Sequence, residues 1–235
     1  MNTPLRSYLS HFSRSSPAYG VHKIASRYIR DRALRYFSGS LLDIGCGAKE
    51  KGVLINELVE SHIGLDHPVT LHDKAKINIF GTAYCLPMQD ETVDCVLCTA
   101  VLEHLEEPQM ALAEACRVLK VGGYALYTVP LFWHVHERPR DFFRYTEHGL
   151  HYLFQKAGFV VQEVTPLSGF LMTFGTEFGY YIQRFRIGPM KYLVDTVVAI
   201  NSWLLPKIDR GILRDENFTW MYLVIAQKTE KFVRK

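Results

Sequence analysis

The sequence predicts an α/β fold, built on a doubly wound sheet of mainly parallel strands. Short apolar segments alternate along the chain with amphipathic helical segments, which is typical of a sheet covered by helices on both faces. The apolar segments are largely continuous, as in VDCVLCTAV at residues 93–101, and strands buried on both faces read this way. In such sheets ligands bind at the carboxyl ends of the strands. The residues that follow each strand are therefore the candidates for function.

Seven strands are predicted in chain order. They are SLLDIGCG (40–47), HIGLDH (62–67), AKINIFGTA (75–83), VDCVLCTAV (93–101), YALYTVP (124–130), FVVQEV (159–164) and FTWMYLVIAQ (218–227). A first helix is predicted over residues 19–37, where Val21, Ile24, Ala25, Tyr28 and Ile29 recur at helical spacing.

Three further helices are predicted between these strands. One follows the first strand and runs to about Glu60. The next covers residues 108–120, with Pro108 in its first turn and two glycines after it. Thr146 is placed to cap the third, and Gly158 to end it.

Charge and cysteine content narrow the class of protein. Of 235 residues, the first 37 contain seven Lys or Arg and one acid. This basic segment is either the solvated face of a helix or a contact with nucleic acid or an anionic membrane. No secretory leader is visible, and no uncharged run reaches the roughly 18 residues of a spanning helix. Cys95 and Cys98 should point to opposite faces of a strand. We therefore predict a cytoplasmic protein with reduced thiols, with membrane association as the alternative.

Acidic residues and glycines follow the first two strands. Asp43, Gly45 and Gly47 end the first strand, and such glycines permit a tight turn and close backbone approach to a ligand. Glu50 stands where the dinucleotide fingerprint has its third glycine. Asp66 ends the second strand, where an acid can bind ribose hydroxyls or cap a turn.

Several motifs in series resemble class I S-adenosylmethionine-dependent methyltransferases, in particular the type-11 methyltransferase group. The motifs are LLDIGCG, the acid that ends the next strand, LP…D…VD, VLEHL and ALAEACRVLKVGGYALYTVP, and they cover residues 39–165. The resemblance implies a Rossmann-like seven-stranded sheet whose last strand is antiparallel and lies between the fifth and sixth. It also implies S-adenosylmethionine (SAM) as the cofactor and methyl transfer as the activity.

The resemblance also implies roles for individual residues at the strand ends. In relatives of this kind Asp43, Gly45 and Gly47 would line the methionine part of SAM, and Asp66 would hold the ribose. Thr82 and Ala83 would lie at the adenine, and Thr99 and Ala100 at the methionine end. Thr82 stands where many relatives carry Asp, and it can accept a hydrogen bond only through its hydroxyl.

Histidines supply the candidates for a catalytic base. The segment HVHERPRDFFRYT (134–146) follows the fifth strand and should lie over the carboxyl edge. We expect His136 to be the base, ahead of His134 and of His104 in VLEHL, because histidine titrates near neutrality. The alternatives are a structural loop, braced by Asp141 and Arg144, and a metal site, for which no closed ligand pattern is visible.

The chain divides into three parts on this basis. Residues 1–38 form a basic helical arm, residues 39–166 and 217–230 the methyltransferase core, and residues 167–216 a helical insertion between the sixth and seventh strands. Aromatic residues recur in the insertion at helical spacing: Phe170, Phe174, Phe178, Tyr181 and Phe185. The insertion is either a lid packed on the sheet edge, a pocket for a hydrophobic acceptor or a peripheral membrane contact.

The sequence therefore predicts an enzyme that transfers a methyl group to oxygen or nitrogen of a small or lipid-linked acceptor, with sugar-containing acceptors included. One alternative is a non-catalytic module that binds the cofactor and uses the insertion to contact a partner or a membrane. The other is a nucleic-acid methyltransferase, which the basic segment would serve. The NPPY-type tetrapeptide of amino-group DNA methyltransferases is missing after the fourth strand, so we expect no nucleic-acid partner.

Overall fold

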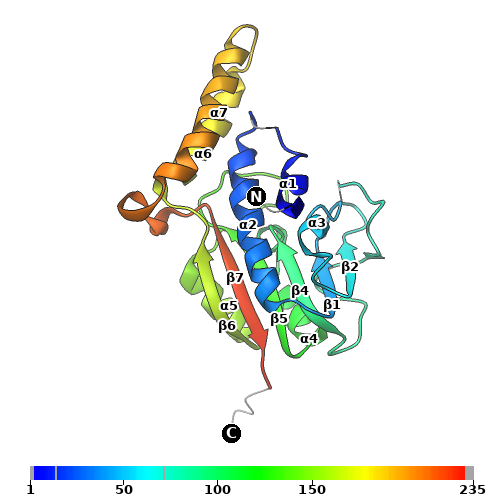
Figure 1. Cartoon of the computed structure of the whole chain (residues 1–235). Helices are drawn as coiled ribbons and strands as arrows, with labels where there is room; N and C mark the ends of the chain where they lie inside the picture. The colour runs from blue at the N-terminus through cyan, green and yellow to red at the C-terminus, as the bar shows by residue number, and fades with distance from the viewer. Residues whose placement is uncertain (1–2, 14, 71, 231–235) are drawn as a thin grey trace.

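The computed structural model describes residues 3–13, 15–70 and 72–230, which form a twisted central sheet with helices on both faces (Figure 1). The sheet has seven strands in the order β3-β2-β1-β4-β5-β7-β6. Their bounds are β1 Ser40–Ile44, β2 Ser61–Asp66, β3 Ile79–Phe80, β4 Val93–Thr99, β5 Leu119–Pro130, β6 Phe159–Pro166 and β7 Met221–Lys228.

The pairing of the strands confirms the predicted fold. β1 pairs with β2 and β4 in parallel, and β4 pairs with β5 in parallel. β7 is antiparallel to both of its neighbours, β5 and β6. The sheet is thus Rossmann-like and seven-stranded, with its last strand inserted in the opposite direction. The carboxyl ends of the parallel strands share one edge, which we call the carboxyl edge.

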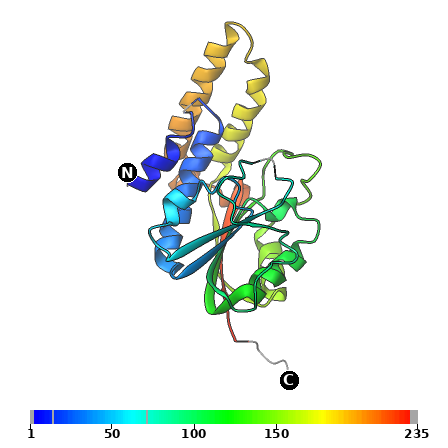
Figure 2. The ribbon, with the colours of Figure 1, turned by 90° about the vertical axis from the view of Figure 1, so that its right-hand side faces the viewer.

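Helices cover the two faces of this sheet (Figure 2). α1 (Thr3–Leu9), α2 (Ala18–Tyr36) and the single turn α3 (Gly52–Ile55) contribute buried side chains to one core cluster. α4 (Pro108–Val118) and α5 (Glu147–Lys156) contribute to the other. The amino-terminal segment is therefore one layer of the fold. Two of its basic side chains are held by ion pairs, Arg30 with Glu57 and Arg32 with Glu163.

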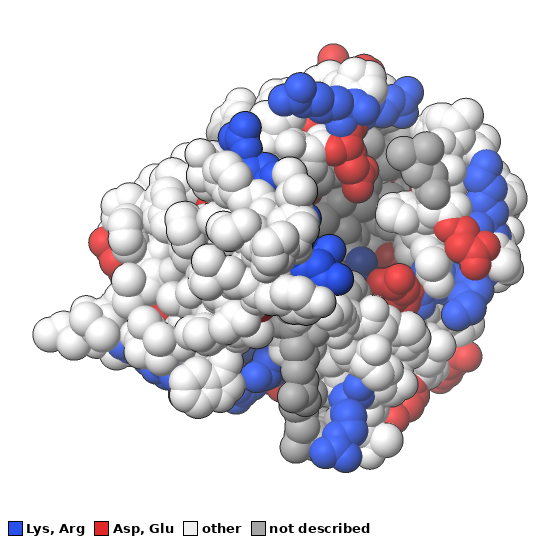
Figure 3. Space-filling model, turned by 90° about the horizontal axis from the view of Figure 1, so that it is seen from above, with Lys and Arg blue, Asp and Glu red and all other residues white. Residues whose placement is uncertain are grey.

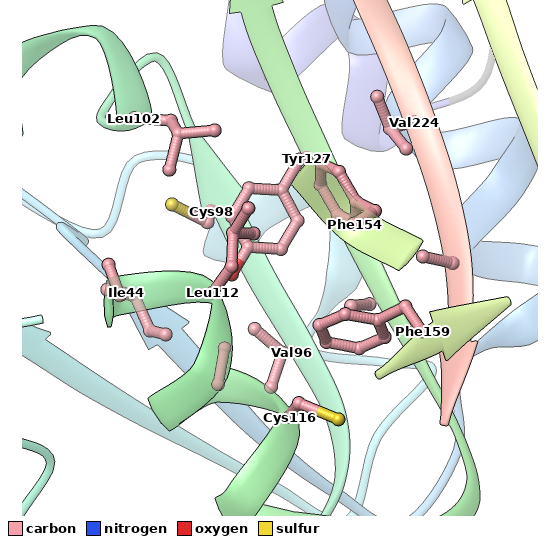
Figure 4. Close-up of a cluster of buried hydrophobic side chains, with 14 of the residues drawn as sticks. Ile44, Val96, Cys98, Leu102, Leu112, Cys116, Tyr127, Phe154, Phe159 and Val224 are labelled. Atoms are coloured by element: carbon pink, nitrogen blue, oxygen red, sulfur yellow. The ribbon is translucent and has the colours of Figure 1, made fainter. Parts of the chain in front are cut away.

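The core that α4 and α5 cover is aromatic at its centre (Figure 4). The rings of Tyr127 on β5 and Phe154 on α5 meet edge to face, with centroids 5.1 Å apart, and both side chains are fully buried. Cys98 lies in this cluster, whereas Cys95 lies in the cluster on the opposite face. The expectation that these two thiols point to opposite faces is confirmed.

Three predicted elements differ from the observed ones. The helix expected up to Glu60 is only the turn α3, because the amides of Glu60 and Ser61 donate to the carbonyl of Gly39 and draw the chain toward the sheet. The strand expected at residues 75–83 shrinks to β3. α4 ends at Val118, and β5 begins at Leu119 and continues through the two glycines that were expected to end the helix.

The segment between β6 and β7 forms a helical hairpin that projects beyond the carboxyl edge (Figures 1 and 2). Its long helices are α6 (Phe170–Ile182) and α7 (Met190–Ile208), and the short 3₁₀ turn η2 (Gln183–Phe185) follows α6. The turns η3 (Gly211–Leu213) and η4 (Glu216–Phe218) lead back to β7. Among the described residues of α7, only Val194 and Val198 are buried.

Candidate functional site

The loop after β1 is shaped for close approach of a ligand. Gly45 has φ of +69° and Gly47 has φ of +52°, a region that residues with a Cβ rarely adopt. A Cβ on Gly45 would lie 2.3 Å from Cγ2 of Val101, so no side chain fits there. This cradle of backbone suits a ligand that binds to main-chain groups at the carboxyl edge.

Two carboxylates flank this loop. Asp66, at the end of β2, accepts hydrogen bonds from the amides of Gly47 and His67, each at 2.6 Å. Each carboxylate oxygen has a further lone pair, so Asp66 can still accept from a diol. Asp43 is 1% exposed, and its Oδ2 lies 3.1 Å from Nε2 of His62. The two acids and the cradle together fit the ribose and methionine parts of SAM.

The other residues that the resemblance places at SAM follow β3 and β4. Ala83 is buried and Thr82 half-buried, directly after β3. Thr99 ends β4 and is 6% exposed. Ala100 has φ of +52° and donates its amide to the carbonyl of Thr128 at 2.9 Å. A strained non-glycine residue at such an edge is typical of a functional site.

The segment 134–146 folds back onto η1 (Leu102–His104), the 3₁₀ turn after β4. The amide of Phe142 donates to the carbonyl of Glu103 at 2.9 Å. The hydroxyl of Tyr145 donates to the carbonyl of Leu102 at 2.8 Å. The loops after β4 and β5 are thereby joined, which brings their histidines together.

An ion pair braces this segment from within. Arg144 donates to both carboxylate oxygens of Asp141, at 2.6 and 2.8 Å, and also to the carbonyls of Trp133 and His134. Asp141 in turn accepts from the amide of His136 at 2.9 Å. Arg144 holds the pKa of the Asp141 carboxyl well below its usual range. The brace fixes the backbone on both sides of His136.

His104 and His136 form a pair at the carboxyl edge, with ring centroids 4.8 Å apart and an edge-to-face arrangement. Nδ1 of His104 lies 2.5 Å from the carbonyl oxygen of Arg140, and Nδ1 of His136 lies 3.2 Å from that of His134. Because a carbonyl only accepts, each Nδ1 must carry the proton. The lone pair of each neutral ring is then on Nε2.

The surroundings keep His136 neutral. Burial, and next the neighbouring His104, lower the pKa of His136 below that of an ordinary histidine, and these effects outweigh the opposing Asp141. A neutral imidazole whose tautomer is fixed can accept a proton at neutral pH. His136 can therefore accept a proton at Nε2.

His134 is held differently. Its Nδ1 lies 3.0 Å from a carboxylate oxygen of Glu177 on α6, and its ring stacks on Trp133 with centroids 5.0 Å apart. Tyr180, also on α6, packs on both rings. His134 therefore links the loop after β5 to the hairpin, whereas His104 and His136 face each other.

Glu103 was not assigned a role from the sequence, although it belongs to the VLEHL motif. Its side chain is 1% exposed, and among the described residues Oε2 has no hydrogen-bond partner. Oε1 lies 3.9 Å from Nε2 of His104. Burial raises the pKa of Glu103 to about 8. An acid next to a histidine after a buried strand is the signal that would have found it.

Glu103, His104 and His136 also have donor types that bind divalent metals, and their ligand atoms lie within 4.8 Å of one another. The metal site expected as an alternative involved His134, which is bound to Glu177 instead. Viewed along the direction in which the hairpin projects, the carboxyl edge is hollowed, with acidic side chains in the wall (Figure 3).

Comparison with known proteins finds a family match over part of the chain. Residues 42–127 match the family model described as "Methyltransferase domain". The ubiquinone biosynthesis O-methyltransferase of Pectobacterium carotovorum is 25% identical over 126 residues, which is 48% of this chain and 52% of that protein. The chain thus spans about half the length of this curated relative.

Solved structures show the same fold at low identity. The (4+2)-cyclase SpnF matches with a TM-score of 0.60 and 19% identity, over 88% of this chain and 82% of its own. A geranyl diphosphate methyltransferase solved in complex with SAM matches with a TM-score of 0.55 and 13% identity, over 90% and 91%. The fold therefore holds SAM in one such structure, and a cyclase shares it.

Proposed function

Because the chain contains a methyltransferase domain of the class I SAM-dependent family, we propose that it transfers the methyl group of SAM to oxygen or nitrogen of a small or lipid-linked acceptor, sugar-containing acceptors included. One observation carries the proposal. The cradle that fits SAM and the His104–His136 pair lie on loops of the same sheet edge, and hydrogen bonds tie the loops after β4 and β5 to each other.

The chain's own residues would hold SAM in the following way. Asp66 accepts from the ribose hydroxyls, while Asp43 and the backbone at Gly45 and Gly47 surround the methionine part. The remaining four residues line the adenine and the methionine end: Thr82, Ala83, Thr99 and Ala100. When bound, SAM supplies a methyl group on a positively charged sulfur, which a nucleophile can attack in line.

His136 would serve the acceptor. Nδ1 of His136 is committed to a carbonyl, so Nε2 takes the proton from a hydroxyl as it attacks, or from an ammonium before the resulting amine attacks. A base positioned in this way contributes on the order of 10²–10⁴ in rate. His104 presents the same nitrogen beside it, and His134 holds the loop to α6. The Asp141–Arg144 brace positions His136 and does not touch the acceptor.

The family's SAM dependence leaves the acceptor open, and the hairpin is the feature that favours a lipid-linked one. Its aromatic side chains are exposed beside the site, among them Phe174 and Phe178. We propose that the chain also contacts a membrane at its periphery, through this hairpin.

Transfer of label from methyl-labelled SAM tests this function. Purified protein is incubated with a cell extract that is then separated into soluble, lipid and nucleic-acid fractions. We expect label in the lipid or soluble fraction, lost in Asp66→Ala and retained in Asp73→Ala, which removes an exposed acid outside the site. A chelator should leave the rate unchanged, because the proposed step uses no metal.

Two results would contradict the proposal. Label in the nucleic-acid fraction would favour the nucleic-acid methyltransferase. Label in no fraction, with SAM binding intact, would favour the non-catalytic binding module.

A further inference from the structure

The end of the α6–α7 hairpin exposes a group of large apolar side chains to solvent. Ile187 is 73% exposed and Tyr192 is 70% exposed. Other large apolar side chains at the same end are also exposed: Tyr181, Phe185, Met190 and Leu193. Exposed apolar residues scattered singly are normal, but a contiguous group marks a binding surface. We call this group, with Arg184 and Lys191, the hairpin tip.

The basic side chains of the hairpin lie on its aromatic rings. Arg184 stacks over Tyr181 and Phe185, 5.3 and 5.6 Å from the ring centroids, and Lys191 lies 5.3 Å from that of Tyr192. Neither Arg184 nor Lys191 has an ion-pair partner among residues that the structure describes. Aromatic rings with Lys and Arg beside them are typical of the boundary between lipid headgroups and acyl chains.

The charge of the hairpin complements an anionic surface. From 170 to 208 the chain has four basic residues and two acids. Both acids have partners within the protein: Glu177 lies against His134, and Asp195 is paired with Arg186. The exposed charge of the hairpin tip is therefore positive.

Basic side chains also lie beside aromatic rings toward the base of the hairpin. A groove of about 590 Å³ lies between the amino-terminal helices and α7, and its lining includes Arg6, Lys23 and Trp203. The ammonium of Lys207 lies 3.3 Å from the centroid of the Trp203 ring. Trp203 is 64% exposed, so the base of the hairpin also presents an aromatic ring to solvent.

We propose that the hairpin tip docks the protein onto an anionic phospholipid bilayer, with its apolar side chains among the acyl chains and its Arg and Lys at the phosphates. Among the described residues, no helix is long and apolar enough to cross a membrane. Docking is therefore interfacial, driven by buried apolar area together with attraction to anionic lipids.

Docking would also orient the candidate site. The hairpin projects beyond the carboxyl edge (Figure 1), and the hollow of that edge opens on the same side (Figure 3). Glu177 and Tyr180 join α6 to the loop that carries His136. A docked hairpin would thus place the acceptor side of the site next to the bilayer. Docking specifies the peripheral membrane contact of the proposed function and rests on it in that respect, but it does not require methyl transfer; the orientation of the site does.

Sedimentation with vesicles tests the docking. The full chain is mixed with phosphatidylcholine vesicles, with and without phosphatidylglycerol, and the bound fraction is measured. We expect binding only to the anionic vesicles. Arg184→Glu with Lys191→Glu, and separately Ile187→Ser with Tyr192→Ser, should each weaken binding about tenfold or more.

A matched control removes apolar surface elsewhere. Tyr152 on α5 is 61% exposed and Val69 is 68% exposed, so Tyr152→Ser with Val69→Ser should leave vesicle binding unchanged. All variants should keep the thermal unfolding midpoint and the SAM affinity of the parent chain. If the tip variants lose vesicle binding but retain SAM affinity, the loss is one of docking and not of the site for methyl transfer.

Three outcomes would overturn the inference. The first is sedimentation of the parent chain with neither type of vesicle, and the second is equal binding by the tip variants. The third is a dimer in solution that the tip variants abolish, without binding to vesicles, because the apolar face would then be covered by a second copy of the chain.

Discussion

At the scale of single residues, hydrogen bonding separates His134 from the other two candidate histidines. His104 and His136 were both expected near the cofactor, and the structure pairs their rings. Carbonyl oxygens fix the proton of each ring on Nδ1, which no sequence pattern reveals. His134 was a candidate behind His136 by sequence, and its nearest partner is Glu177, 43 positions later in the chain. Such contacts depend on the tertiary fold, so the sequence could place the histidines at the edge but could not assign them.

Glu103 gives a prediction for stability against pH. Burial raises its pKa from 4.5 to about 8, so between these values the folded state holds a proton that the unfolded state has released. The contribution of Glu103 to the free energy of unfolding therefore falls as the pH rises, by up to about 1.4 kcal/mol per pH unit.

Glu103→Gln cannot titrate, so its stability relative to the parent chain should increase from about pH 5 to about pH 8. Urea denaturation across this range measures the difference. A difference between variant and parent that does not change with pH would show that Glu103 is ionised in the folded protein.

At the scale of elements, periodicity predicted the long helices and the buried strands, because each depends on apolar residues at a fixed spacing. It failed where tertiary contacts set the ends. The carbonyl of Gly39 accepts from the amide of Glu60 and draws it away from the helix expected there. Gly122 and Gly123 were expected to end a helix, but they lie within β5. The hairpin shows the same limit: its aromatic spacing indicated a helix, but could not decide whether a lid or a projection forms.

The brace in the loop after β5 is the element on which the position of His136 depends. Asp141 is 2% exposed in its side chain and accepts from both Arg144 and the amide of His136. Asp141→Asn removes the charge that Arg144 faces, and the free energy of unfolding should fall by about 2 kcal/mol.

Turnover should fall as well, while SAM affinity should be retained, because no SAM contact is lost. Asp195→Asn breaks a similar pair on the exposed hairpin and should change stability little. Denaturation and SAM titration of both variants measure these effects. Equal losses of stability in the two would contradict a special role for the brace.

At the scale of the whole molecule, one sheet edge gathers the glycine loop after β1, the histidine pair and the base of the hairpin. The place of β7 between β5 and β6 and its antiparallel direction followed from the resemblance to a family. They could not be read from the apolar pattern, which is the same for a strand in either direction. The low identity to solved structures shows that the fold is kept while side chains change, so the acceptor has to be sought in the residues particular to this chain.

The central claim is that His136 removes the proton at a site which binds SAM independently of it. It is tested most directly by measuring methyl transfer and SAM affinity together in His136→Ala, with His148→Ala, an exposed histidine on α5, as the control. We predict that turnover of His136→Ala falls about tenfold or more while its SAM dissociation constant stays within about threefold, and that His148→Ala matches the parent chain. Unchanged turnover in His136→Ala would contradict the account.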